Sequence, residues 1–155
     1  MDNIENILTH ETIKKIKSEV DNSPILKKLI EEYPIDNLLD FNEFNVKEKL
    51  QHNAFVQEQF RLIYISEKRS YNKLEEKLSK LTGERYDYYK YKNNKALSKT
   101  EIERYYLPKD ENLDRLKQLL QLQEVKVAFF ESMADAFKAQ GFNMKTFVEN
   151  LKIGG

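Results

Sequence analysis

The stretch from Asn112 to Gly141, NLDRLKQLLQLQEVKVAFFESMADAFKAQG, decides the fold of this chain. Its apolar residues recur at alternating steps of three and four, which is the a/d pattern of a helix that packs along one seam. The seam positions are Leu113, Leu116, Leu120, Gln123, Val127, Phe130, Ala134, Phe137 and Gly141. Further apolar residues widen this face, so we predict a helix over residues 112–140 that is buried against more than one neighbour.

The predicted long helix has two candidate partners, and it can contact both. It can pack against a helix over residues 52–82 of the same chain, and it can also assemble with copies of itself. Under self-association, Gln123 would set the register, as buried polar residues do in coiled coils. We predict an elongated, mainly α-helical protomer with two long helices and short terminal helices, which oligomerises through the C-terminal helix. The candidate oligomerisation residues are Leu116, Leu120, Gln123, Val127, Phe130, Ala134 and Phe137.

The N-terminal part of the chain reads as short helices. Apolar residues at helical spacing predict one helix over residues 3–20. Ser23 followed by Pro24 is a good helix start, and the second helix that it opens ends near Pro34. Residues 35–46 are predicted to form an irregular connection, with a short strand as the alternative.

Apolar residues at helical spacing also predict a long helix from about Val46 to Tyr89, with Glu67 and Ser70 interrupting its apolar seam. We expect Thr82-Gly83 to kink or end this helix, because glycine is a poor helix former. Ser98 and Glu101 form a capping box, which predicts a short helix over residues 99–105.

Two further breaks are predicted downstream. The segment Leu107-Pro108-Lys109-Asp110 interrupts the helical pattern. Gly141 is expected to end the long helix, because glycine is the preferred residue just after a helix C-terminus. Asn143 would then cap a short final helix that carries Phe147 and Leu151.

Composition narrows the class of protein. The chain has 26 basic and 26 acidic residues and no cysteine. No apolar run reaches the length of a signal peptide or the roughly 20 residues of a membrane span, so we expect a cytoplasmic protein without membrane contacts. Charge is unevenly distributed, because residues 51–107 hold 12 basic and 8 acidic side chains. Such a local excess of positive charge attracts a polyanion.

The sequence carries no sign of catalytic or metal chemistry. The only two histidines, His10 and His52, have no metal-ligand spacing, and without cysteine a tetrahedral zinc site is not expected. Nucleotide-binding and nucleophile motifs are absent. Carboxylates alternate with lysines at helical intervals, as on a solvated face. We therefore expect a protein that is not an enzyme and that needs no cofactor.

A basic, tyrosine-rich cluster lies over residues 80–106. Four tyrosines fall between residues 86 and 91, and the group Arg104-Tyr105-Tyr106 follows. Rings alone could pack into a core with their hydroxyls in water, but a core has no use for the cations. Single-stranded nucleic acid uses both, since its bases stack on rings and its phosphates pair with cations. The candidate binding residues are Lys80, Arg85, Tyr88, Tyr89, Lys90, Tyr91, Lys92 and Lys95.

Three blocks resemble the UvsY family, the recombination mediators of T-even-type phages. They are Arg85-Tyr-Asp-Tyr-Tyr89, Lys99-Thr-Glu-Ile102 and the apolar stretch from Phe130 to Phe142. The resemblance covers about residues 50–153, and residues 1–45 look like an acidic extension to a core over residues 46–155. The family has two basic residues before its Asp-Tyr-Tyr run. Here Arg85 matches one, while Gly83 occupies the place of the other, for which Lys80 or Lys90 could substitute.

The resemblance implies an accessory protein of phage recombination in the host bacterial cytoplasm. Such proteins bind single-stranded DNA as ring-shaped homo-oligomers, displace the single-strand-binding protein and load a RecA-type recombinase. Residues 112–153 would form the oligomerisation helix, and residues 80–106 the DNA-binding patch. A rival interpretation is a helical structural or adaptor protein without a nucleic-acid role, which predicts the same helices but no salt-sensitive affinity for single strands.

Overall fold

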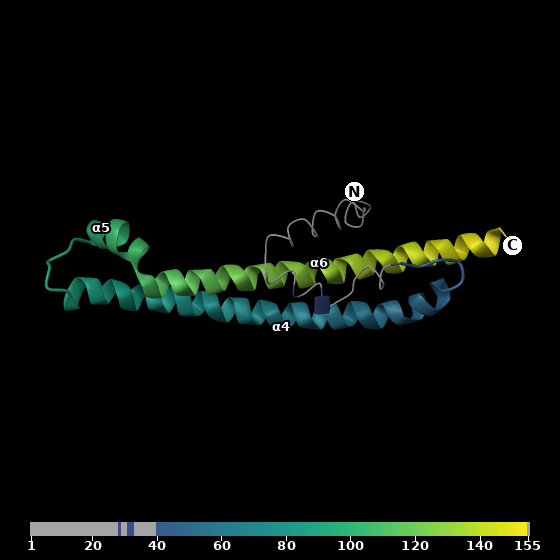
Figure 1. Ribbon diagram of the computed structural model, residues 1–155, viewed down its shortest axis with the longest axis horizontal. Helices are drawn as coiled ribbons and strands as arrows, with labels where there is room; N and C mark the ends of the chain where they lie inside the picture. The colour runs from purple at the N-terminus through teal and green to yellow at the C-terminus, as the bar shows by residue number, and fades with distance from the viewer. Residues whose placement is uncertain (1–27, 29–30, 33–39, 155) are drawn as a thin grey trace. The chain divides into compact units, whose positions relative to one another are not determined.

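The computed structural model describes residues 28, 31–32 and 40–154, and every regular element in these ranges is helical (Figure 1). Two long helices, α4 (Val46–Asp87) and α6 (Glu111–Ile153), account for most of them. Four short elements lie between, namely the π-helix η1 (Tyr88–Lys92), α5 (Lys99–Glu101), the π-helix η2 (Ile102–Tyr106) and the 3₁₀-helix η3 (Leu107–Lys109). The prediction of a mainly α-helical fold with two long helices is confirmed.

Most of the N-terminal predictions concern residues outside the ranges that the structure describes. The helix predicted over residues 3–20 lies outside the described ranges. Of the helix predicted from Pro24 onward, only Lys28, Glu31 and Glu32 are described, and they are helical. Residues 40–45 of the predicted connection form loop and turn, so the irregular connection is confirmed for these residues and the strand alternative is wrong there.

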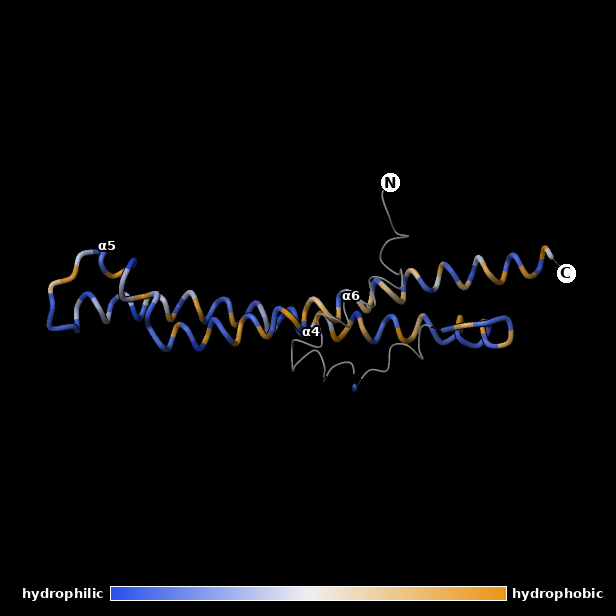
Figure 2. Tube along the Cα trace, turned by 45° about the horizontal axis from the view of Figure 1, so that its top comes forward, coloured by the Kyte–Doolittle hydropathy of each residue, from blue (hydrophilic) through white to orange (hydrophobic). Residues whose placement is uncertain are grey.

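The chain divides into two compact units, and each long helix contributes to both. One unit holds the described residues up to Ser66 together with those from Lys126 onward, and the second holds Glu67–Val125. Hydrophilic and hydrophobic residues alternate along α4 and α6, as expected for helices with one apolar side (Figure 2). No helix among the described residues is long and apolar enough to cross a membrane.

Aromatic rings form the core of the first unit. Phe60 of α4 is 3% exposed and stacks on Phe137 of α6, with 5.3 Å between ring centroids and 15° between ring planes. Phe130, two α6 seam steps earlier, lies 6.3 Å from the same Phe60 ring. Val127 is also buried. The predicted packing of the α6 seam against the preceding long helix is confirmed for Phe130 and Phe137.

Gly141 lies inside α6, so the predicted helix end at this residue and the separate final helix capped by Asn143 are wrong. The glycine instead allows a side chain of α4 to lie directly against α6. The Asn53 side chain of α4 donates a hydrogen bond from Nδ2 to the Phe137 carbonyl oxygen at 2.9 Å. A Cβ atom at position 141 would lie 2.9 Å from that nitrogen. Gly141 therefore leaves space for a buried amide between the helices.

Gly83 lies inside α4, so the helix end predicted as one alternative at Thr82-Gly83 is also wrong. The glycine is exposed, and an added Cβ would meet no atom within 4 Å. An exposed helical glycine costs only about 1 kcal/mol relative to alanine. Side chains beyond it, Arg85 and Tyr89, are anchored to Asp110, which helps to keep the helix intact past the glycine.

Replacing either of these two glycines by alanine should change the free energy of unfolding, and the two changes should have opposite signs. Gly83→Ala should raise the free energy of unfolding by about 0.5–1 kcal/mol, because alanine is the better helix former. Gly141→Ala should lower it by about 1–3 kcal/mol, because the new methyl group displaces Asn53. Urea unfolding followed by circular dichroism measures both. In an Asn53→Ala background the Gly141→Ala loss should largely vanish. Equal signs for the two variants would contradict this account.

A polar layer crosses the helices of the second unit. Gln123, at a seam position of α6, donates from Nε2 to the backbone oxygen of Glu67 at 2.9 Å and to the Glu67 carboxylate. The two polar residues that interrupt the apolar pattern of α4 and α6 at these places are thus partners. Gln123 has its partner in the same chain, where the pair aligns α4 with α6.

Candidate nucleic-acid interface

The tyrosines of the cluster begin in the last turn of α4. The last turn of α4 passes directly into η1, where the backbone bonds widen to the i→i+5 pattern. Such segments are rare and frequently lie at functional sites. Residues 93–95 then form bends after the end of η1.

The capping box at Ser98 is confirmed. Ser98 Oγ accepts a hydrogen bond from the Glu101 amide at 3.2 Å, and the Glu101 carboxylate accepts one from the Ser98 amide at 2.7 Å. This second bond lowers the pKa of Glu101. The short helix predicted over residues 99–105 is present, but after Glu101 it continues as the π-helix η2. The predicted break at Leu107–Asp110 is the 3₁₀-helix η3 followed by one extended residue.

Asp110 holds the cluster to the start of α6. Its side chain is only 2% exposed. One carboxylate oxygen, Oδ1, accepts the Leu113 amide at 3.0 Å and so caps α6. The other, Oδ2, accepts Arg85 Nε at 2.6 Å and the Tyr89 hydroxyl at 2.7 Å. A single buried carboxylate therefore joins α4, η1 and α6.

The charges at this junction stabilise one another. Burial alone would raise the pKa of Asp110, but the hydrogen bonds from Tyr89, the Leu113 amide and Arg85 outweigh it and lower that pKa. Burial, and then the bond to Asp110, raise the pKa of Tyr89. The pKa of Arg85 is raised by its bond to Asp110. At neutral pH the junction therefore consists of a carboxylate, a guanidinium cation and a neutral phenol.

Our sequence reasoning did not assign Asp110 a role beyond a chain break. Its signal was nevertheless present, because an aspartate directly before an apolar-periodic segment is a preferred N-cap. The signal for its pairing with Arg85 was absent, since 25 residues separate the two in sequence.

Two of the predicted DNA-binding residues, Arg85 and Tyr89, are built into this junction. The Tyr89 ring is half-buried and lies 5.3 Å from the rings of Tyr88 and Tyr106. The Arg85 guanidinium carbon lies 4.3 Å from the centroid of the Tyr88 ring. Both side chains thus fix the orientation of Tyr88, whatever else they contact.

The remaining predicted residues are two rings and four lysines, and all six are exposed. Tyr88 is 41% exposed and Tyr91 is 74% exposed. The Lys90 amine lies within 6 Å of the ring centroids of Tyr86 and Tyr91. The other lysines among the predicted DNA-binding residues are Lys80, Lys92 and Lys95. Like Lys90, they form no salt bridge with any residue that the structure describes.

The predicted oligomerisation residues are at least partly buried in the single chain. Val127, Phe130 and Phe137 are buried. The others are half-buried, namely Leu116, Leu120, Gln123 and Ala134. The same helix also exposes apolar side chains, with Leu119 at 54% and Leu122 at 44%. Oligomerisation through the seam residues stays a prediction.

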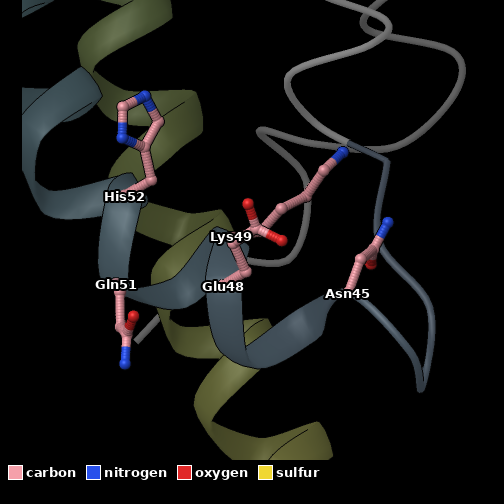
Figure 3. Close-up of a pocket in the computed structure, with 5 residues that line it drawn as sticks. All are labelled: Asn45, Glu48, Lys49, Gln51 and His52. Atoms are coloured by element: carbon pink, nitrogen blue, oxygen red, sulfur yellow. The ribbon is translucent and has the colours of Figure 1, made fainter.

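A pocket lies at the first turns of α4, in the first unit (Figure 3). Polar side chains line it, among them Glu48 and His52, and the Lys49 amine donates to the Asp40 carbonyl oxygen. Among the described residues, no three histidine, aspartate or glutamate side chains are grouped so that they could hold a metal ion. The pocket therefore offers neither a metal site nor the aromatic and basic pairing of the tyrosine cluster.

Known proteins share the family pattern and the fold of this chain. A family model described as recombination, repair and ssDNA binding protein UvsY matches residues 29–154, so the likeness begins before residue 50. The crystal structure of the bacteriophage T4 recombination mediator protein UvsY is similar, with a TM-score of 0.69 and 18% sequence identity. That similarity covers 83% of this chain and 98% of the phage protein, and it shows a shared fold. Comparison with curated proteins found no match.

Proposed function

This chain belongs to the UvsY family of recombination, repair and single-stranded-DNA-binding proteins, and we propose that it acts as a recombination mediator. In this role it binds single-stranded DNA, helps to displace the single-strand-binding protein and loads a RecA-type recombinase. Family membership supports recombination and DNA binding, and the exposed rings and cations near the end of α4 support a specific surface for it.

The observation that carries the proposal is the exposed pairing of tyrosines with unneutralised lysines. Tyr91 exposes 74% of its surface, which a tyrosine that served only the core would not do. Tyr88 and Tyr91 offer ring faces to unpaired bases, and lysines beside them meet the phosphates. The proposed phosphate contacts are Lys80, Lys90, Lys92 and Lys95.

Arg85 and Tyr89 contribute to this surface by holding it in place. Asp110 anchors both side chains, and the Arg85 guanidinium lies against the Tyr88 ring. A platform that is already ordered before DNA arrives loses less conformational entropy on binding. The junction thus raises affinity by ordering the Tyr88 ring before the DNA binds.

Assembly into a homo-oligomer, with a ring as the expected form, would multiply a modest single-site affinity. A strand that contacts several linked sites gains avidity of about 10²–10⁴ over one site, provided that the sites can be reached together. The oligomer also provides a scaffold on which the single-strand-binding protein gives way to the recombinase.

The test is fluorescence anisotropy with a labelled poly-dT oligonucleotide. Replacing both Lys90 and Lys92 by alanine should weaken binding and reduce the slope of log affinity against log salt by about 0.7 for each phosphate that is no longer neutralised. Titrations at about 50 and 300 mM salt resolve this slope change. A Lys138→Ala variant, which removes an exposed lysine of the first unit, is the control and should bind like the parent.

The outcomes separate the two interpretations of the chain. Parent protein that binds single strands more tightly than a matched duplex, with a steep salt dependence, supports the mediator proposal. Binding that is unchanged in the double lysine variant would refute the assigned surface. A parent protein without affinity for either DNA at low salt would favour the helical adaptor.

A further inference from the structure

A second π-helix, η2, lies against the first within the same unit. The Tyr106 ring of η2 is 5.3 Å from the Tyr89 ring of η1. Well under 1% of residues in globular proteins adopt this conformation, so two contacting segments of it form an unusual feature. The Tyr89–Tyr106 contact and the Asp110 anchor place η2 beside the surface that carries Tyr88 and Tyr91.

The residues of η2 separate into inward and outward positions. Ile102 is fully buried and Tyr106 is half-buried, so these two side chains hold η2 in place. Arg104 is exposed, and Tyr105 exposes 59% of its surface. Packing of η2 accounts for the first pair of residues and leaves the second pair unexplained.

The charges around η2 leave Arg104 as the available cation. The Glu101 carboxylate is occupied by the Ser98 amide in the capping box. Glu103 lies 3.9 Å from the Lys99 amine, one helical turn away. Arg104 makes no salt bridge with any residue that the structure describes. At successive positions, η2 therefore exposes a cationic side chain and a ring, the two kinds of group that η1 also exposes.

We propose that η2 extends the single-stranded-DNA interface, with Arg104 as a phosphate contact and Tyr105 as a base-stacking contact. This proposal rests on the proposed function, because it requires that single-stranded DNA bind at η1. The same DNA strand would then continue across η2. A guanidinium suits the task, since its planar fork donates two hydrogen bonds to one phosphate. The ligand at η2 is a continuation of the same DNA strand, so the affinity that η2 contributes should increase with oligonucleotide length.

The test compares variants on labelled poly-dT oligonucleotides of increasing length. Tyr105→Ala should weaken binding of the longer oligonucleotides by about 5- to 150-fold, the loss expected for one stacked base, and should leave the shortest bound strands less affected. Arg104→Ala should reduce the salt slope by about 0.7, as for one phosphate contact on a single strand.

Matched variants separate recognition from general effects. Tyr105→Phe keeps the ring and should bind like the parent protein. Arg115→Ala removes an exposed arginine of the same unit that lies 3.9 Å from Glu111, and it should also leave binding unchanged. Photocrosslinking with an oligonucleotide that carries 5-iododeoxyuridine, followed by mass spectrometry, should label the peptide that contains Tyr105.

Failure of this proposal can be told apart from failure of the proposed function. If Lys90→Ala/Lys92→Ala weakens binding while Tyr105→Ala and Arg104→Ala do not at any length, η2 is a support for η1 and the inference is overturned. A crosslink in η1 without a crosslink at Tyr105 would overturn the inference in the same way. A parent protein that does not bind single strands overturns both proposals.

Discussion

Replacing Phe60 by alanine is expected to lower the free energy of unfolding by about 3–5 kcal/mol, the usual loss for a phenylalanine removed from a well-packed core. Phe60 is 3% exposed and contacts two rings of α6, Phe130 and Phe137. The truncation removes buried apolar surface and leaves a cavity between rigid helices that cannot close around it. Equilibrium denaturation in urea, followed by circular dichroism at the helical signal, measures the loss.

Phe55 supplies the matched control on the same helix. It lies five residues before Phe60 but is 59% exposed, so Phe55→Ala should change the free energy of unfolding by no more than about 0.5 kcal/mol. Similar losses for the two variants would contradict the core described for the first unit. A loss at Phe60 below that at Phe55 would show that the stacked rings do not stabilise the helix pair.

Replacing Asp110 by alanine is expected to lower the free energy of unfolding by about 2–4 kcal/mol, because the variant loses an N-cap and two hydrogen bonds that involve a charged group. The Asp110 carboxylate is 2% exposed, so water cannot replace these bonds in the folded protein. Arg85 and Tyr89 would each lose a partner, and the first turn of α6 would lose its cap. Urea denaturation at neutral pH measures the effect.

Asparagine at position 110 is the control that separates the cap from the charge. Asp110→Asn keeps an oxygen for the Leu113 amide, so it should recover about 1 kcal/mol of the alanine loss. Equal losses in the two variants would show that capping contributes nothing here. An alanine loss below about 1 kcal/mol would refute the junction as a source of stability.

The stabilising effect of Asp110 should also depend on pH, with a sign that follows from its lowered pKa. The folded state favours the ionised carboxylate, so the unfolded chain binds more protons in acid. The contribution is present in full above the ordinary carboxyl range, about pH 4, and is lost as pH falls through the folded-state pKa. The stability difference between the parent and Asp110→Asn should therefore shrink in acid.

Much of the fold was predictable from local patterns. The three-and-four spacing of α6, the capping box at Ser98 and the end of α4 near Tyr89 depend on residues close together in sequence. The two glycines were not predictable in this way. Gly83 and Gly141 carry the same local signal for a helix end, yet α4 and α6 run through both, because tertiary contacts outweigh a penalty of about 1 kcal/mol.

The candidate site was predictable in its composition and not in its division of roles. Clustering of tyrosines and cations indicated where single-stranded DNA could bind. In the sequence, however, Arg85 and Lys90 are both basic residues of the same cluster and cannot be told apart. The structure distinguishes them, since Arg85 is bonded to Asp110 while Lys90 is exposed. Glu67 and Gln123 likewise interrupt the apolar seams of the two helices, and only the structure shows that they are hydrogen-bond partners.

The sequence by itself determined the helical class, the lengths of the apolar seams, the capping box and the position of the tyrosine cluster, because these depend on neighbours within a few residues. Only the tertiary structure decided that Asn53 fills the space left by Gly141, that Asp110 receives Arg85 and Tyr89, and that η2 packs on η1. Each of these contacts joins residues that are 17 or more positions apart. Local periodicity carries no information about such pairs, which form only when whole helices are packed together.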